Sequence, residues 1–121
     1  MPRTSLSLTS LAGFSLAFLT VLPAAMAQVS NANVRAVNTA RIRAERINGG
    51  LNNYRAAKCM YATADGGGSC LKSTADGFLF VFNGGQPGWQ EYGRPPLVET
   101  EILISSDGRT VVEEIYNGEP R

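Results

Sequence analysis

The stretch FLFVF at residues 78–82 decides the fold, because its five consecutive apolar side chains leave no polar side for water. Such a run is typical of a buried strand. The turn-forming residues ADG precede it at positions 75–77. The stretch therefore predicts a central strand, either covered on both faces or packed with one face against a helix.

A hairpin is expected on the C-terminal side of this strand. Apolar and polar residues alternate over residues 97–104 and 109–116, and SDG at 106–108 joins the two segments. Gly108 fits the left-handed position of a type I turn followed by a bulge. The expected pairs are Ile102 with Val112 and Ile104 with Thr110. Residues 117–121 are expected to fray.

Two short strands are predicted on the N-terminal side, at residues 58–63 and 70–74, with a glycine-rich loop between them. They would place Cys59 opposite Cys70 across a hairpin. These two cysteines are the only ones in the chain. An even count with one possible pairing predicts a disulfide between them, provided that the protein works in an oxidising compartment.

An amphipathic helix is predicted over residues 31–48, because apolar side chains recur there at spacings of three and four. Asn31 or Asn33 can cap its start, and Gly49 with Gly50 ends it. Its apolar stripe consists of Val34, Val37, Ala40, Ala44 and Ile47. The predicted fold is α+β: an N-terminal amphipathic helix packed on a four- to five-stranded antiparallel sheet as a two-layer sandwich.

The first 27 residues have the pattern of a cleavable Sec-type signal peptide. Arg3 is followed by an apolar stretch, Pro23 interrupts it, and AMA at 25–27 is the small-x-small motif of a cleavage site. Residues 28–121 would then form a single small exported domain without a stable membrane anchor. The expected location is the periplasm, the thylakoid lumen or the extracellular medium, where disulfides persist.

The charges are unevenly distributed along the chain. Residues 28–58 carry six basic side chains and only Glu45, a net charge of +5, whereas residues 59–121 have a net charge of −5. One interpretation is internal complementarity between a basic helix and an acidic sheet. The other is a docking face for an acidic partner or an anionic surface. Nucleic acid is not an expected partner, because exported proteins seldom meet it.

The sequence contains no histidine, so the commonest general base and the commonest metal ligand are absent. With both cysteines oxidised, a thiolate nucleophile is absent as well. No catalytic motif is recognisable, and no cofactor is expected. The sequence therefore favours a protein that is not an enzyme.

The candidate contact surface is the Gly- and Pro-rich loop at residues 83–96, which is expected to lack regular structure. It contains Trp89, Tyr92 and Arg94. Aromatic residues beside an arginine are typical of recognition surfaces. Trp89 could equally be an anchor that packs the loop onto the sheet.

A second candidate is a group of carboxylates on the last hairpin, where Glu99, Glu101 and Glu113 are expected to share one face. They form a weak candidate for a calcium site or for a carboxylate-based hydrolase. The alternative is a solvated outer face that Arg109 or Lys72 balances.

The leading functional hypothesis is an exported, non-enzymatic binding or accessory domain for an unknown protein or small-molecule ligand. The alternatives are a periplasmic inhibitor or chaperone-like module that acts on a protein target, and a small hydrolase that uses the three glutamates. The second hypothesis depends on fold analogy alone.

Three segments, NGGLNNYRA at 48–56, CMY at 59–61 and GGQPGWQ at 84–90, carry a resemblance to known proteins. With them the chain resembles small exported cyanobacterial proteins of unknown function. The resemblance implies export and a single domain, and it transfers no activity and no site residue.

Overall fold

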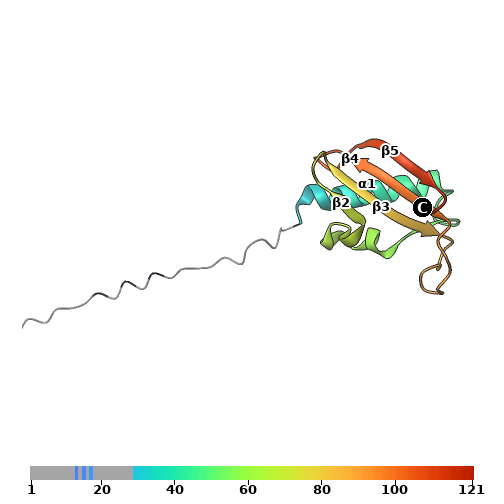
Figure 1. The fold of residues 1–121 in the computed structure, drawn as a ribbon, viewed down its shortest axis with the longest axis horizontal. Coiled ribbons are helices and arrows are strands. Elements are labelled where there is room, and N and C mark those ends of the chain that lie inside the picture. Colours follow the sequence, from blue (N-terminus) through green and yellow to red (C-terminus); the bar gives the residue numbers. More distant parts are fainter. Residues whose placement is uncertain (1–12, 14, 16, 18–28) are drawn as a thin grey trace, which may run out of the picture.

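The computed structural model describes residues 29–121 and, before them, only residues 13, 15 and 17 (Figure 1). The predicted signal peptide therefore lies almost entirely outside the described residues. Within the described part of the chain, no helix is long and apolar enough to cross a membrane. One α-helix lies against one face of an antiparallel sheet, which confirms the predicted α+β class.

Helix α1 (Asn31–Ile47) confirms the predicted helix within one residue. Its N-cap is Ser30, whose Oγ accepts a hydrogen bond from the N–H of Asn33 at 3.1 Å. The prediction of Asn31 or Asn33 as cap was wrong, because both are already part of the helix. The face towards the sheet consists of small or β-branched side chains, which let the helix approach closely: Ala36, Val37, Ala40 and Ala44.

Strand β3 (Phe78–Gly85) begins at the FLFVF stretch and is central, as predicted. It pairs along its whole length with β4 (Val98–Ile104), which pairs in turn with β5 (Val111–Gly118). The other edge of β3 is shared by two short strands, β1 (Arg55–Ala56) and β2 (Leu71–Ser73), at its opposite ends. Under α1 the sheet contributes the buried side chains of Phe80, Phe82, Ile102 and Ile104.

The segment between β1 and β2 differs from the prediction. Residues 58–63 do not form a strand, because the chain coils into the 3₁₀ turns η1 (Lys58–Tyr61), η2 (Thr63–Asp65) and η3 (Gly68–Cys70). The N–H of Met60 donates to Ala57 O at 3.0 Å within η1, and the Met60 side chain is fully buried in the core. The glycine loop then passes over Phe80, and a Cβ on Gly67 would lie 2.8 Å from that ring.

The disulfide between Cys59 and Cys70 is present, with a Cα–Cα distance of 6.0 Å. It joins η1 to η3 and does not cross a hairpin between strands as predicted. A disulfide is compatible with an oxidising compartment.

The hairpin of β4 and β5 has the predicted turn, with Gly108 in the left-handed conformation at φ 77°. Its register was predicted wrongly. Ile102 pairs with Glu114 and Ile104 with Val111, because two irregularities shift β5 along β4. Strand β5 also continues through Asn117 and Gly118, where fraying was expected.

Candidate functional site

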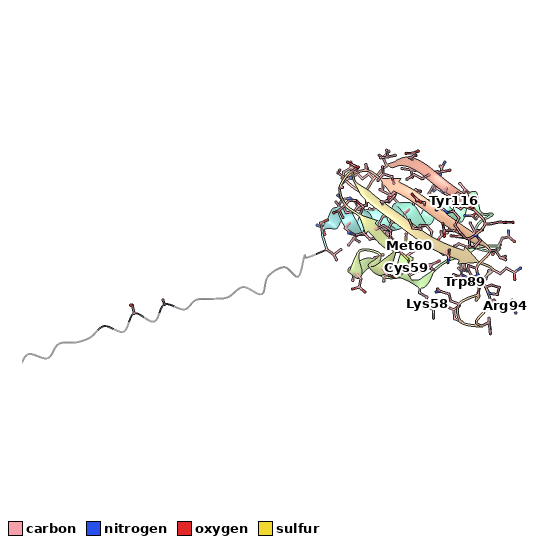
Figure 2. All side chains as sticks on the ribbon, viewed as in Figure 1. Lys58, Cys59, Met60, Trp89, Arg94 and Tyr116 are labelled. Carbon is pink, nitrogen blue, oxygen red and sulfur yellow. A yellow bond between two sulfur atoms is a disulfide. The ribbon has the colours of Figure 1, made fainter. Side chains whose placement is uncertain are left out.

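The loop predicted at residues 83–96 divides into a strand end and a folded turn. Residues 83–85 belong to β3, since Gly84 and Gly85 pair with β1. The chain then folds back on itself: Trp89 N–H donates to Gln86 O, and Arg94 N–H donates to Trp89 O. We call residues 86–93 the aromatic turn. It lies at the end of the domain where Lys58, Trp89 and Arg94 are found (Figure 2).

Trp89 fixes the aromatic turn to the sheet. Its side chain is 7% exposed, and its indole Nε1 donates to the backbone oxygen of Arg55 at 3.0 Å. The ring covers Gly85, where a Cβ would lie 2.9 Å from Trp89 Cγ. This geometry favours the anchor interpretation of Trp89, and only an edge of the indole remains to face a ligand.

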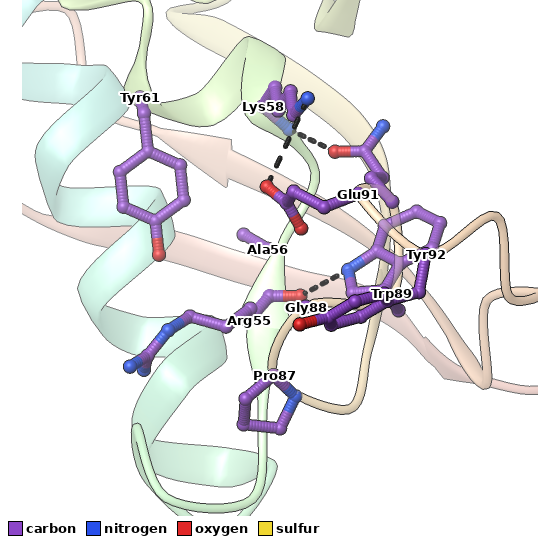
Figure 3. Close-up of a pocket in the computed structure, with 10 residues that line it drawn as sticks. Arg55, Ala56, Lys58, Tyr61, Pro87, Gly88, Trp89, Glu91 and Tyr92 are labelled. Carbon is purple, nitrogen blue, oxygen red and sulfur yellow. Dashed lines mark hydrogen bonds and ion pairs between the residues drawn. The ribbon is translucent and has the colours of Figure 1, made fainter.

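A hollow of about 490 Å³ opens between the aromatic turn and the segment from β1 to η1 (Figure 3). Ala56 and Trp89 supply apolar surface to it. Tyr61 from η1 and Tyr92 from the aromatic turn are 46% and 75% exposed. The remaining lining residues are Arg55, Lys58, Pro87, Gly88, Gln90 and Glu91.

The hollow is weakly positive, with Arg55 and Lys58 against Glu91. Lys58 Nζ lies 3.9 Å from Glu91 Oε1, and both side chains are more than half exposed. Such a pair contributes little and competes poorly with a ligand. Arg55 donates through Nη1 to the backbone oxygen of Leu51 at 2.5 Å, which orients its guanidinium group.

Tyr61 lies beside an ion pair of opposite charges, Arg41 and Glu45. The guanidinium carbon of Arg41 lies 4.9 Å from the centre of the Tyr61 ring, while Arg41 Nε lies 3.3 Å from Glu45 Oε1. Partial burial, followed by the negative charge of Glu45, raises the pKa of the Tyr61 phenol above its ordinary value. The phenol therefore remains neutral at neutral pH and can donate a hydrogen bond.

Both walls of the hollow are held in place. The backbone N–H of Lys58 donates to Gln90 Oε1 at 2.7 Å, which ties η1 to the aromatic turn. Arg41 Nη1 donates to Met60 O at 2.9 Å, and the disulfide ties the other side of η1 to η3. The hollow is therefore largely preformed.

Of the three predicted contact residues, Trp89 and Tyr92 lie on the aromatic turn and Arg94 directly follows it, but they do not all face the same hollow. The guanidinium carbon of Arg94 lies 5.6 Å from the centre of the Tyr92 ring. Arg94 lines a smaller hollow of about 190 Å³, together with Gln86, Trp89, Pro95 and Leu97. The sequence prediction missed Arg55, Lys58 and Tyr61. The aromatic and basic residues of YRAAKCMY at 54–61 were the available signal.

Two of the three predicted glutamates are balanced by Arg121, and not by Arg109 or Lys72. Arg121 Nε lies 2.6 Å from Glu99 Oε2, and Arg121 Nη2 lies 3.0 Å from Glu101 Oε1. Glu113 pairs with Leu103, which places it on the same face as Glu99 and Glu101, as predicted, but Tyr116 and not Glu113 lies opposite Glu101. In the part of the chain that the structure describes, no three His, Cys, Asp or Glu side chains gather closely enough to hold a metal ion.

No family model, no curated protein and no solved structure matches this chain. None of these comparisons links it to small exported cyanobacterial proteins, so that resemblance stays a prediction.

Proposed function

We propose that this protein is an exported, non-enzymatic binding domain whose ligand occupies the hollow between the aromatic turn and η1. The observation that carries the proposal is the pair of exposed rings, Tyr61 and Tyr92, around a preformed hollow that also contains Arg55 and Lys58. Aromatic rings beside cationic groups are the residues that contribute most to recognition.

The size and rigidity of the hollow support a small ligand. Small-molecule sites have volumes of roughly 300–1,000 Å³, and this hollow has about 490 Å³. Because hydrogen bonds and the disulfide already fix both walls, little conformational entropy would be lost on binding. The two cations against one carboxylate favour a ligand that is neutral or negatively charged.

The proposed protein is exported and is not an enzyme. The signal-like residues 1–27 and the Cys59–Cys70 disulfide support a location in the periplasm, the thylakoid lumen or the medium. The chain has no histidine, and both of its thiols are in the disulfide. The groups at the hollow suit binding better than proton transfer or nucleophilic attack.

The single tryptophan of the chain makes the proposal directly testable. Trp89 borders the hollow, so a bound ligand should change its fluorescence. We would titrate a panel of neutral and anionic ring compounds and repeat each titration with Tyr92→Ala and Arg55→Gln. Arg35→Gln, which removes the same charge at a residue outside the hollow, is the control. A compound that binds wild type and Tyr92→Ala equally well would place the site elsewhere.

A second candidate function uses the opposite edge of the sheet. Strand β5 forms that edge, and Val112 and Ile115 on it are 57% and 42% exposed. An inhibitor or chaperone-like module could present such an edge to an extended segment of a protein target. A lysine in place of Ile115 would then abolish retention of the target, whereas Tyr92→Ala would not affect it.

A further inference from the structure

A third hollow, which shares no residue with the two hollows beside Trp89, lies between α1 and the hairpin of β4 and β5. Its volume is about 270 Å³. It is lined by Thr39, Ile42, Arg43, Arg46, Arg109 and Val111. Arg43 and Arg46 lie one helical turn apart on α1, and Arg109 reaches the same hollow from the hairpin turn, 63 positions further along the chain than Arg46.

The positive charge of this hollow is only partly neutralised. Arg43 forms an ion pair with Glu114. Within residues 29–121, the side chains of Arg46 and Arg109 form no ion pair and no hydrogen bond. Residues 1–28 contain no Asp or Glu, so they offer no carboxylate. Internal complementarity therefore accounts for Arg43 but leaves the other two cations of this hollow, Arg46 and Arg109, without a carboxylate partner among the described residues.

One further carboxylate lies near this hollow. Asp107 accepts hydrogen bonds from Ser105 Oγ at 2.6 Å and from the N–H of Arg109 at 3.0 Å. These bonds hold its carboxylate within the hairpin turn. It reduces the local positive charge but does not occupy the guanidinium groups of Arg46 or Arg109.

The lining also has an apolar part. Ile42, which is 39% exposed, and Val111 lie among the three arginines. Thr39 Oγ1 donates to Gly108 O at 2.7 Å, so this hydroxyl joins the helix to the hairpin turn. The hollow therefore places guanidinium groups next to apolar surface, and the contact between Thr39 and Gly108 fixes the helix relative to the hairpin turn.

We infer that this hollow binds a phosphate group, carried by a ligand with an apolar part next to the phosphate. Guanidinium groups match phosphate oxygens in bidentate geometry, and they are less strongly hydrated than ammonium groups. Like charges gathered in one hollow repel each other, and a bound anion relieves that repulsion. Both a lipid headgroup and a soluble phosphate ester have this chemistry.

The test uses inorganic pyrophosphate as the soluble probe and vesicles as the lipid probe. We expect saturable pyrophosphate binding by calorimetry at low ionic strength. Arg46→Gln and Arg109→Gln should each weaken it about tenfold, the size of a charge-assisted hydrogen bond. Arg94→Gln, an equal change of charge at an exposed residue of the hollow of about 190 Å³, should leave the affinity unchanged.

Two neighbouring glutamates provide a sharper control. Glu114 pairs with Ile102 and reaches Arg43, whereas Glu113 pairs with Leu103 on the other face of the sheet. Glu114→Gln frees Arg43 and should tighten pyrophosphate binding about threefold. Glu113→Gln removes the same charge and should change it less, because Glu113 forms no ion pair with an arginine of the hollow.

The vesicle arm identifies the source of the phosphate. Sedimentation with phosphatidylglycerol vesicles, but not with phosphatidylcholine vesicles, and loss of that binding in Arg46→Gln would assign a lipid headgroup. Pyrophosphate binding without vesicle binding would assign a soluble phosphate ester. The inference is overturned if neither probe binds, or if Arg94→Gln weakens binding as much as Arg46→Gln. Failure of both probes to bind does not bear on the hollow beside Trp89, which the ring-compound titrations test separately, whereas an equal loss in Arg94→Gln would move the phosphate site to the Trp89 side of the domain.

Discussion

Gly84 leaves the space that the ring of Tyr54 occupies: a Cβ on Gly84 would lie 2.2 Å from Tyr54 Cε2 and 2.4 Å from its hydroxyl oxygen. Tyr54 is 2% exposed and is one of the largest fully buried side chains of the core. Because Gly84 pairs with Ala56 of β1, the same contact sets how closely β1 approaches β3. Ala56 also lines the hollow of about 490 Å³ beside Trp89, so the position of that wall depends on the contact between Gly84 and Tyr54.

Gly84→Ala should destabilise the protein strongly. The added methyl group meets a rigid ring in a packed core, and overpacking of this kind costs about 1–3 kcal/mol in the free energy of unfolding. Denaturant titration measures the loss. Gly118→Ala is the control, because its Cβ would meet only the Tyr116 side chain, with the nearest atom at 3.0 Å. Equal losses in the two variants would contradict this account.

Tyr54 should make the stability depend on alkaline pH. Its hydroxyl has no hydrogen-bond partner among the described residues, and burial raises the pKa of the phenol above its ordinary value of 10.0. The nearby Thr100 hydroxyl, which donates to Asn117 Oδ1, lowers that pKa by less. Above pH 10 the unfolded phenol loses its proton and the folded one keeps it, so the free energy of unfolding falls as the pH rises.

Tyr54→Phe should remove the part of that dependence that Tyr54 contributes, while the part due to Tyr61 remains. Denaturant titrations between pH 9 and pH 11 give the free energy of unfolding. Above pH 10 it should fall less steeply in the variant than in wild type, by about 1.4 kcal/mol per pH unit. At neutral pH the variant should be as stable as wild type or slightly more so, because a buried hydroxyl without a partner is lost. A marked loss at neutral pH would show that the hydroxyl does have a partner.

The features predicted correctly from sequence were those with a strong local signal. The 3.6-residue period gave α1, the apolar run at 78–82 gave β3, and Gly108 gave the last turn. The pairing of Cys59 with Cys70 followed from their count alone. Each of these predictions depends on residues close together in sequence or on a pairing without alternatives.

The remaining features depend on contacts that no local pattern reports. Two irregularities in the pairing shift β5 along β4, so the predicted partner of Ile104 is wrong by one residue and that of Ile102 by two. Only the shift by one residue exchanges the faces of the strand. Residues 58–61 coil because Met60 reaches the core. Arg55, Lys58 and Tyr61 join the hollow only because Trp89 carries the aromatic turn back onto β1, a contact across 34 residues.

The disulfide should stabilise the domain and the wall of the first hollow together. It closes a loop with a sequence separation of 11, for which chain entropy predicts about 2–3 kcal/mol in the free energy of unfolding. Reduction should lower the denaturant midpoint accordingly. The variant with both Cys59→Ser and Cys70→Ser should start at the reduced midpoint and show no response to reductant. An equal response in that variant would mean that reductant acts by another route.

Trp89 and Tyr92 should separate stability from binding. Trp89→Ala removes a buried ring and its hydrogen bond to Arg55 O, so it should lower the free energy of unfolding by about 3 kcal/mol or more. Tyr92→Ala removes a ring that is 75% exposed and should change stability by no more than about 0.5 kcal/mol. Thermal denaturation compares the two variants. A small effect of Trp89→Ala would mean that the aromatic turn stays on β1 without its anchor, and the indole would then be free to act as a contact residue.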